Sequence, residues 1–215
     1  RIDGATGDTL ITSAKTSGTA VLLKGTLTQS NNSEGIVLYQ DDSTVSATGG
    51  GDVVLLAEVS GSGAASRIYM EQATISAALG GRVQLKAPGN IDVYTSNLLT
   101  SGPQGGVGGE ISVWTDSDNN KAGRIAIGQP TCVSTISNCA APADNGGARI
   151  VIGGGLADSG NAFFPAGGGA HNATAWPGVR LGTTNATNGV RIFSGGGDIR
   201  IASEQTAGLA SLTSG

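Results

Sequence analysis

The chain has few charges, few aromatic rings and no long apolar segment. Charged residues make up 13% of its 215 residues and aromatic residues 4%, with one methionine and one histidine. Lys and Arg occur singly and the net charge is −4, which excludes the basic patch of a nucleic-acid-binding protein. No apolar run approaches the roughly 18 residues of a membrane-spanning helix. The chain begins at Arg1 instead of Met, which predicts a processed form or a segment of a longer protein.

Cysteine is scarce as well, with only Cys132 and Cys139. A metal or redox pair is one interpretation, but the spacing does not fit Cys-x-x-Cys chemistry and no further ligands complete a zinc site. We therefore expect a disulfide that closes a short loop in an oxidising compartment. The composition, poor in Lys and rich in Gly, Ser, Thr and Asn, likewise predicts a secreted or cell-surface location.

Glycine is abundant, with 37 residues, and the sequence repeats itself at an offset of 30. The segment 44–57 recurs as 74–87, with the same small residues, the same Gly-Gly pair and the same Val-x-Leu-x-Ala strand. Similar pairs, each followed by a short alternating strand, end at Gly51, Gly81, Gly109, Gly147 and Gly197. Period-2 alternation predicts β-strands, and a repeat of this length indicates stacked supersecondary units.

These patterns predict an all-β chain that folds as a right-handed parallel β-helix, with about 30 residues and three short strands per turn. It forms one domain over residues 1–215, with regular turns at about 19–130 and turns with loop insertions at about 131–215. The 30-residue self-similarity argues against the rival architecture, an antiparallel sandwich.

The offset also predicts which side chains lie against each other. In the core we expect two stacked aliphatic pairs, Val53 with Val83 and Leu55 with Leu85. On the surface we expect Tyr39 to stack on Tyr69, and alternating charges in the series Asp52, Arg82 and Glu110, which favour in-register stacking.

Three segments carry a family resemblance. Gly-Gly-Asp-Val-Val-Leu-Leu-Ala at 50–57, Gly-Gly-Arg-Val-Gln-Leu-Lys-Ala at 80–87 and Gly-Gly-Asp-Ile-Arg-Ile-Ala at 196–202 resemble the repeats of filamentous-haemagglutinin-like exoproteins. Those are bacterial surface and secreted proteins with long β-helical shafts. The resemblance covers residues 19–130 well and 146–203 loosely. It implies an extracellular filament or adhesin and supplies no catalytic residues, and the Asn-Pro-Asn-Gly-type secretion signature is absent from the sequence.

Two groups of acidic residues suggest sites. Asp116, Asp118 and Asn120 place oxygen ligands at alternate positions, as in a calcium loop, but Lys121 stands where an EF-hand has Gly, and a polar corner between two strands is the alternative. No other cofactor is expected. Asp41, Asp42 and Glu71 could cluster and supply the carboxylate pair of a glycosidase, because Asp41 and Glu71 are separated by the repeat offset and so are expected to stack; a solvated polar edge is the alternative interpretation. We predict that the protein is not an enzyme.

The distinctive insertion at 156–177 holds Phe163, Phe164 and Trp176. These rings are either a contact patch for a glycan, a neighbouring subunit or another surface, or a structural cap. Because a β-helix has open edges at both ends, copies of the chain are expected to stack end to end. The sequence thus favours a structural or adhesive extracellular protein, with surface glycans or a host or neighbour cell surface as further partners. The alternative is a polysaccharide-binding or polysaccharide-cleaving β-helix protein.

Overall fold

The computed structural model describes residues 2–3, 9–28, 34–60, 66–115, 117, 124–128, 130–136, 139, 147–154, 179–181 and 189–203. These residues form strands and turns, together with one short 3-10 turn at Pro103–Gly105 (η1). The strands belong to two sheets, and their pairs are parallel. The prediction of an all-β chain is confirmed. None of the described segments has the helical length and apolar character that a membrane crossing requires.

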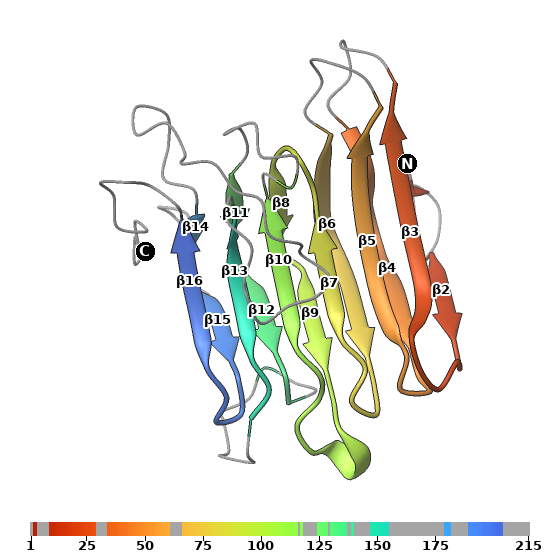
Figure 1. Ribbon diagram of the computed structural model, residues 1–215, viewed down its shortest axis with the longest axis vertical. Coiled ribbons are helices and arrows are strands. Elements are labelled where there is room, and N and C mark those ends of the chain that lie inside the picture. Colours follow the sequence, from red (N-terminus) through yellow and green to blue (C-terminus); the bar gives the residue numbers. More distant parts are fainter. Residues whose placement is uncertain are drawn as a thin grey trace.

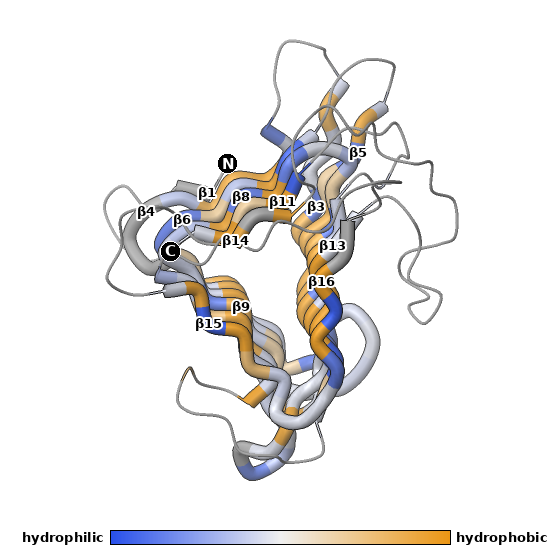
Figure 2. The backbone as a smooth tube through the Cα atoms, turned by 90° about the vertical axis from the view of Figure 1, so that its left-hand side faces the viewer, coloured by the Kyte–Doolittle hydropathy of each residue, from blue (hydrophilic) through white to orange (hydrophobic). Residues whose placement is uncertain are grey.

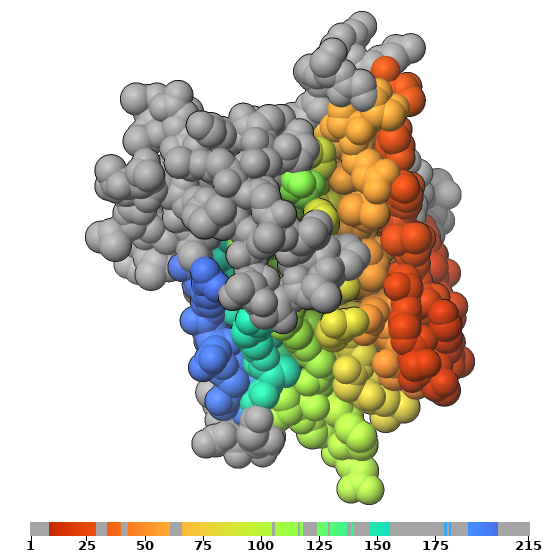
Figure 3. Space-filling view, viewed as in Figure 1, coloured from red at the N-terminus to blue at the C-terminus, as the bar shows by residue number. Residues whose placement is uncertain are grey.

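The six-stranded sheet follows the order of the chain from one side of the molecule to the other (Figures 1 and 3). Its strands are, in spatial order, β3 (Thr19–Leu27), β5 (Asp52–Val59), β7 (Val83–Lys86), β10 (Ile111–Thr115), β13 (Ile150–Gly154) and β16 (Ile199–Ser203). Because the strands are parallel, every connection must return the chain to the same end of the sheet. The connecting segments therefore have to travel around the molecule.

The ten-stranded sheet has two arms, which share the long strands β4 (Glu34–Ala47) and β6 (Arg67–Ala77). The first arm continues from the first half of β6 into β8 (Ile91–Tyr94), β11 (Ile125–Ile127) and β14 (Val179–Leu181). The second arm continues from the second half of β6 into β9 (Asn97–Thr100), β12 (Thr131–Ser134) and β15 (Val190–Phe193). Two shorter strands, β1 (Ile2–Asp3) and β2 (Leu10–Ser13), pair with β4.

The chain turns from the first arm to the second through a single residue with left-handed backbone. Gln72 lies at this corner within β6 with a φ of 53°, and Thr95 lies between β8 and β9 with a φ of 48°. One residue of this conformation redirects a strand without a loop. In Figure 2 the strands accordingly superimpose in three rows, the two arms and the six-stranded sheet, around a common interior.

The interior consists of rows of aliphatic side chains, one residue from each strand. Alternation places every second residue inward, so parallel pairing stacks the inward residues of adjacent strands about 4.8 Å apart. Two rows cross the six-stranded sheet: Val21, Val53, Val83, Ile111, Ile150, Ile199 and Leu23, Leu55, Leu85, Val113, Ile152, Ile201. Another crosses the second arm: Ile11, Val45, Ile75, Leu98, Val133, Ile192. Full burial of such a side chain contributes about 1.5–3 kcal/mol, so these rows dominate the stability of the fold.

The pairing follows the predicted repeat offset only in part. Val53 pairs with Val83 and Leu55 with Leu85, as predicted. The next step in this sheet, from Val83 to Ile111, is slightly shorter, and the two after it, to Ile150 and then to Ile199, are much longer.

The fourth glycine pair is displaced by one position from the pairing of the strands. The sequence pattern aligns Gly147 with Gly109, because each is the second glycine of its pair. Strand register pairs Ile111 with Ile150, so Ala148 occupies the position equivalent to Gly109. The glycine pairs therefore mark the start of each strand without fixing its register.

Glycines stack in a column where the second arm turns into the six-stranded sheet. A Cβ on Gly81 would overlap the carbonyl oxygen of Gly51, and a Cβ on Gly109 would lie 2.5 Å from the carbonyl oxygen of Gly80. In these two pairs the second glycine is required by the close approach of the neighbouring turn, whereas Gly80 meets nothing within 4 Å and is favoured by its positive φ of 87°.

Candidate functional site

The outer face of the first arm carries the strongest concentration of aromatic and charged side chains among the described residues. Along β6, Ile68 and Met70 point into the core, so Arg67, Tyr69 and Glu71 point outward. Strand register then places Tyr39 of β4 and Tyr94 of β8 on either side of Glu71. We call Tyr39, Tyr69, Tyr94 and Glu71 the tyrosine cluster.

Glu71 is held within this cluster by a charge-assisted hydrogen bond. The Tyr69 hydroxyl donates to Glu71 Oε2 at 2.5 Å. The Tyr69 ring lies 6.1 Å from that of Tyr39 and 6.0 Å from that of Tyr94, with interplanar angles of 43° and 51°. Burial, followed by the hydrogen bond to the Glu71 carboxylate, raises the pKa of the Tyr69 hydroxyl. The cluster therefore places the protonated Tyr69 hydroxyl against the Glu71 carboxylate.

Arginines and a buried aspartate flank the cluster. The guanidinium carbon of Arg67 lies 5.4 Å from the centroid of the Tyr69 ring, a cation–π contact, and its Nη2 lies 2.7 Å from Glu34 Oε1. Asp92 lies opposite Tyr69 and is only 3% exposed. Burial raises the pKa of the Asp92 carboxyl, and Arg124, with Nη2 3.8 Å from Asp92 Oδ1, acts in the opposite direction.

The predicted stacking of Asp41 on Glu71 is wrong. The register between β4 and β6 shifts between Tyr39 and Ser43, so that Tyr39, and not Asp41, lies opposite Glu71. The Asp41 side chain lies outside the described residues. Among the described residues of this face, Asp92 is a further carboxylate and is almost fully buried.

The predicted pair of Tyr39 and Tyr69 needs the same correction. The residue opposite Tyr69 on β4 is Val37, so the two tyrosines meet diagonally and their rings are tilted instead of stacked. Tyr94 and Asp92 were missed because the step from β6 to β8, which pairs Ile68 with Ile91, is shorter than the repeat offset. The alternation Ile-Asp-Val-Tyr at 91–94 marks the strand itself, so what the sequence does not show is the strand with which it pairs.

The outer edge of the six-stranded sheet carries a row of alternating charges. Strand register aligns five residues, which we call the charge row: Asp52, Arg82, Glu110, Arg149 and Asp198. Arg82 Nη2 lies 2.7 Å from Asp52 Oδ2, and Arg149 Nη2 lies 2.7 Å from Glu110 Oε2. The row contains the three predicted residues and two more, Arg149 and Asp198. These two were not predicted because the fourth glycine pair is displaced by one residue from the strand register.

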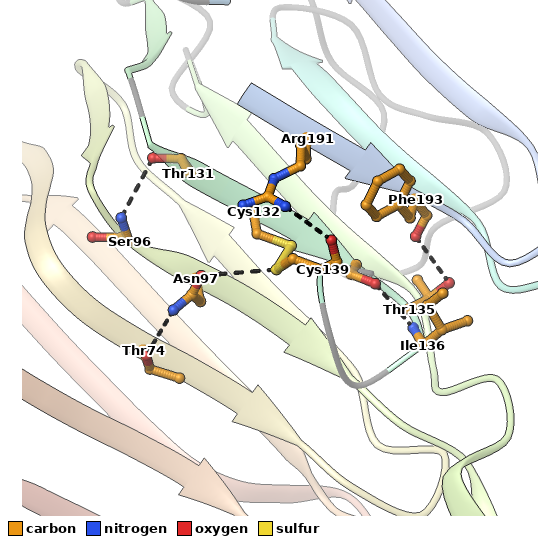
Figure 4. The surroundings of a disulfide bond; sticks show 11 residues. Thr74, Ser96, Asn97, Thr131, Cys132, Thr135, Ile136, Cys139, Arg191 and Phe193 are labelled. Atoms are coloured by element: carbon orange, nitrogen blue, oxygen red, sulfur yellow. Dashed lines mark hydrogen bonds between the residues drawn. A yellow bond between two sulfur atoms is a disulfide. The ribbon is translucent and has the colours of Figure 1, made fainter. Parts of the chain in front are cut away.

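The disulfide between Cys132 and Cys139 is present, with a Cα–Cα distance of 6.0 Å, which confirms that prediction (Figure 4). Cys132 lies on β12 between Asn97 of β9 and Arg191 of β15. Arg191 Nη1 donates to the Cys139 carbonyl oxygen at 3.1 Å, and Asn97 Nδ2 donates to Thr74 Oγ1 at 3.2 Å. The disulfide thus tethers the loop after β12 to the outside of the second arm.

The two ends of the stack are open in the part of the chain that the structure describes. At one end β3 pairs only with β5 and β2 only with β4; at the other, β16 pairs only with β13 and β15 only with β12. Each of these strands therefore presents a row of backbone groups without a strand partner.

Several predicted site residues lie outside the described residues: Asp116, Asp118, Asn120, Phe163, Phe164 and Trp176. Within the described ranges, no group of three or more His, Cys, Asp or Glu side chains is arranged to hold a metal ion. Comparisons with protein families, curated proteins and solved structures find no match to this chain.

Proposed function

We propose that the chain is a right-handed parallel β-helix and serves as a structural or adhesive protein outside a bacterial cell, as a shaft segment or filament subunit. The observation that carries the proposal is the aliphatic rows, which continue from β3 to β16 and from β2 to β15. Rows of this kind make a stiff rod whose length is set by the number of turns. Because a crossover between parallel strands is almost always right-handed, we assign that hand.

Three further features support this role. The repeats at 50–57, 80–87 and 196–202 resemble those of filamentous-haemagglutinin-like exoproteins. A disulfide is typical of oxidising compartments outside the cytosol. The open ends provide sites for copies of the chain, while the insertions in the C-terminal half are proposed to meet surface glycans or another cell.

Negative-stain electron microscopy of the purified protein tests this function. Long fibres of uniform width are expected, and their number should rise with protein concentration. Dispersed short particles at high concentration would contradict the filament role.

A second function, polysaccharide binding, is favoured by the tyrosine cluster. Partly exposed tyrosine rings pack on the apolar faces of sugars, while Glu71 and Arg67 offer polar partners for hydroxyl groups. Retention on insoluble polysaccharides should fall in Tyr94→Ala and be unchanged in Lys24→Ala, a substitution on β3 of the other sheet. Equal retention of both variants and the parent would remove this candidate.

A further inference from the structure

The unpaired strands at the two ends of the stack have compatible directions. All pairs in the six-stranded sheet are parallel, so β16 and β3 point the same way. A second copy placed beyond β16 in the same orientation can therefore add its β3 as the next parallel strand. In this head-to-tail arrangement, the translation that places β3 of the second copy beside β16 of the first also places β2 of the second copy beside β15 of the first.

Exposed apolar side chains concentrate at these ends. Among the described residues the large hydrophobic side chains that stay exposed are Leu10 (67%), Leu22 (52%), Leu79 (51%) and Ile199 (46%). Leu10 lies on β2, Leu22 on β3 and Ile199 on β16, so three of the four lie on end strands. Ile199 belongs to an inner row in which Ile111 and Ile150 are fully buried. It is exposed because the row stops there, and such a surface favours association.

We propose that copies of the chain join head to tail, with β16 of one copy beside β3 of the next and β15 beside β2, in the register that continues the inner rows. This inference rests on the proposed filament function and specifies its joint. Three apolar contacts define it: Ile199 against Val21, Ile201 against Leu23, and Ile192 against Ile11 of the next copy. Each is of the kind found between adjacent turns within the chain.

The charges at the two ends agree with this register. On the outer side Asp198 falls beside Thr19, Arg200 beside Leu22, and Arg191 beside Leu10 of the next copy, so no like charges meet. The aliphatic stems of the two arginines would cover the two exposed leucines. None of these pairs joins two charges, so the free energy of the joint comes from the burial of apolar side chains.

Slipped registers are disfavoured. A slip of one residue would turn Ile199 and Ile201 away from the interior. A slip of two residues toward the strand end would keep the alternation but place Arg200 beside Lys24, where like charges repel. Compared with these two slips, the proposed register keeps Ile199 and Ile201 inward and keeps Arg200 away from Lys24.

Cysteine pairs test the register directly. Thr19→Cys and Asp198→Cys are prepared as separate proteins, mixed under assembly conditions and oxidised. Adjacent parallel strands bring such Cα atoms to about 4.8 Å, within disulfide range. A cross-linked dimer is expected in the mixture and not in either variant alone. Lys24→Cys mixed with Asp198→Cys is the off-register control and should give none.

A pair of matched substitutions tests the apolar contact. Ile199→Lys should abolish assembly in sedimentation, whereas Leu79→Lys, at a similarly exposed leucine away from the end strands, should leave it intact. Circular dichroism confirms that each variant is folded, and the cysteine experiment remains decisive if Ile199→Lys is not.

The outcomes separate this inference from the proposed function. Fibres with the Thr19–Asp198 cross-link support both. Fibres in which the single variants cross-link to themselves, or only the Lys24 pair reacts, would overturn this joint and leave the filament function standing. A protein that stays monomeric at all concentrations would overturn both.

Discussion

Single residues of this chain are most constrained where the backbones of neighbouring turns meet. Gly81 is the clearest example, because a methyl group there would overlap the carbonyl oxygen of Gly51. That oxygen belongs to the backbone of an adjacent turn, so it cannot move aside as a flexible side chain could. The overlap can be relieved only if the two neighbouring turns move apart.

We expect Gly81→Ala to lower the free energy of unfolding by about 1–3 kcal/mol, the usual cost of overpacking. Gly189→Ala is the matched control, since a Cβ on Gly189 meets no atom within 4 Å, and its effect should stay within about 0.5 kcal/mol. Chemical denaturation followed by circular dichroism measures both. Equal stabilities would show that the turns can separate freely at Gly81.

Asp92 gives a second prediction, which concerns pH. Burial raises its pKa above the ordinary value of 3.8 in the folded state. The folded state then retains a proton that the unfolded state has released, so this contribution to stability is complete below pH 3.8 and is lost as the pH rises through the raised pKa. We expect Asp92→Asn to be more stable than the parent near neutral pH, with the difference vanishing below pH 3.8.

Thermal unfolding at a series of pH values measures this difference. Asp52→Asn is the contrasting variant, because Asp52 accepts hydrogen bonds from the Arg82 backbone and guanidinium groups and should lose stability when neutralised. If Asp92→Asn were instead less stable near neutral pH, the attraction of Arg124 would outweigh the cost of burying the carboxylate.

Strands are held in register by the charge row as well as by the core. Arg82 lies between Asp52 and Glu110 and forms a 2.7 Å ion pair with Asp52, which is only 7% exposed. Arg82→Glu would place three acidic groups in succession. We expect this substitution to lower the free energy of unfolding by about 1–2 kcal/mol. This is the contribution of a hydrogen-bonded charge pair, reduced because Arg82 is partly exposed.

The comparison for this prediction is Lys24→Glu, which disrupts the exposed pair of Lys24 with Glu58 (2.8 Å) and should cost about 0.5 kcal/mol. Denaturant unfolding in low and high salt measures both variants. The effect of Arg82→Glu should shrink in high salt, since screening weakens repulsion between partly exposed charges. A salt-independent loss would point to packing of the arginine stem instead.

How far the sequence predicts the fold depends on which part of a turn is considered. Alternation identified the strands and the stacking of Val53 on Val83, because inward and outward positions follow from strand geometry alone. Corners were not predictable, since a left-handed residue such as Gln72 redirects the chain without a glycine to mark it. The corner of β4, between Tyr39 and Ser43, holds more residues than the corner of β6, so the predicted surface pairs are out of register. The tyrosine cluster could be identified only once the strand pairs were known.

The whole molecule is a stack in which each strand contacts mainly its two neighbours. Stability should then vary along the stack, because the end strands lack one neighbour. We expect amide hydrogen exchange to be slowest in β7, β8 and β10 and fastest in β3 and β16. Mass spectrometry of dispersed protein measures the gradient, and uniform protection would indicate a single cooperative unit.

The uneven steps between turns have a practical consequence. Ile150 and Ile199 are adjacent rungs although they are far apart in the sequence, so strand pairing does not depend on the length of the intervening chain. The sequence between β13 and β14 contributes no residue to the strand pairs that precede and follow it in the described chain. If the subunits assemble as proposed, any peptide carried at a fixed position of the chain would recur once per subunit, at regular intervals along a fibre.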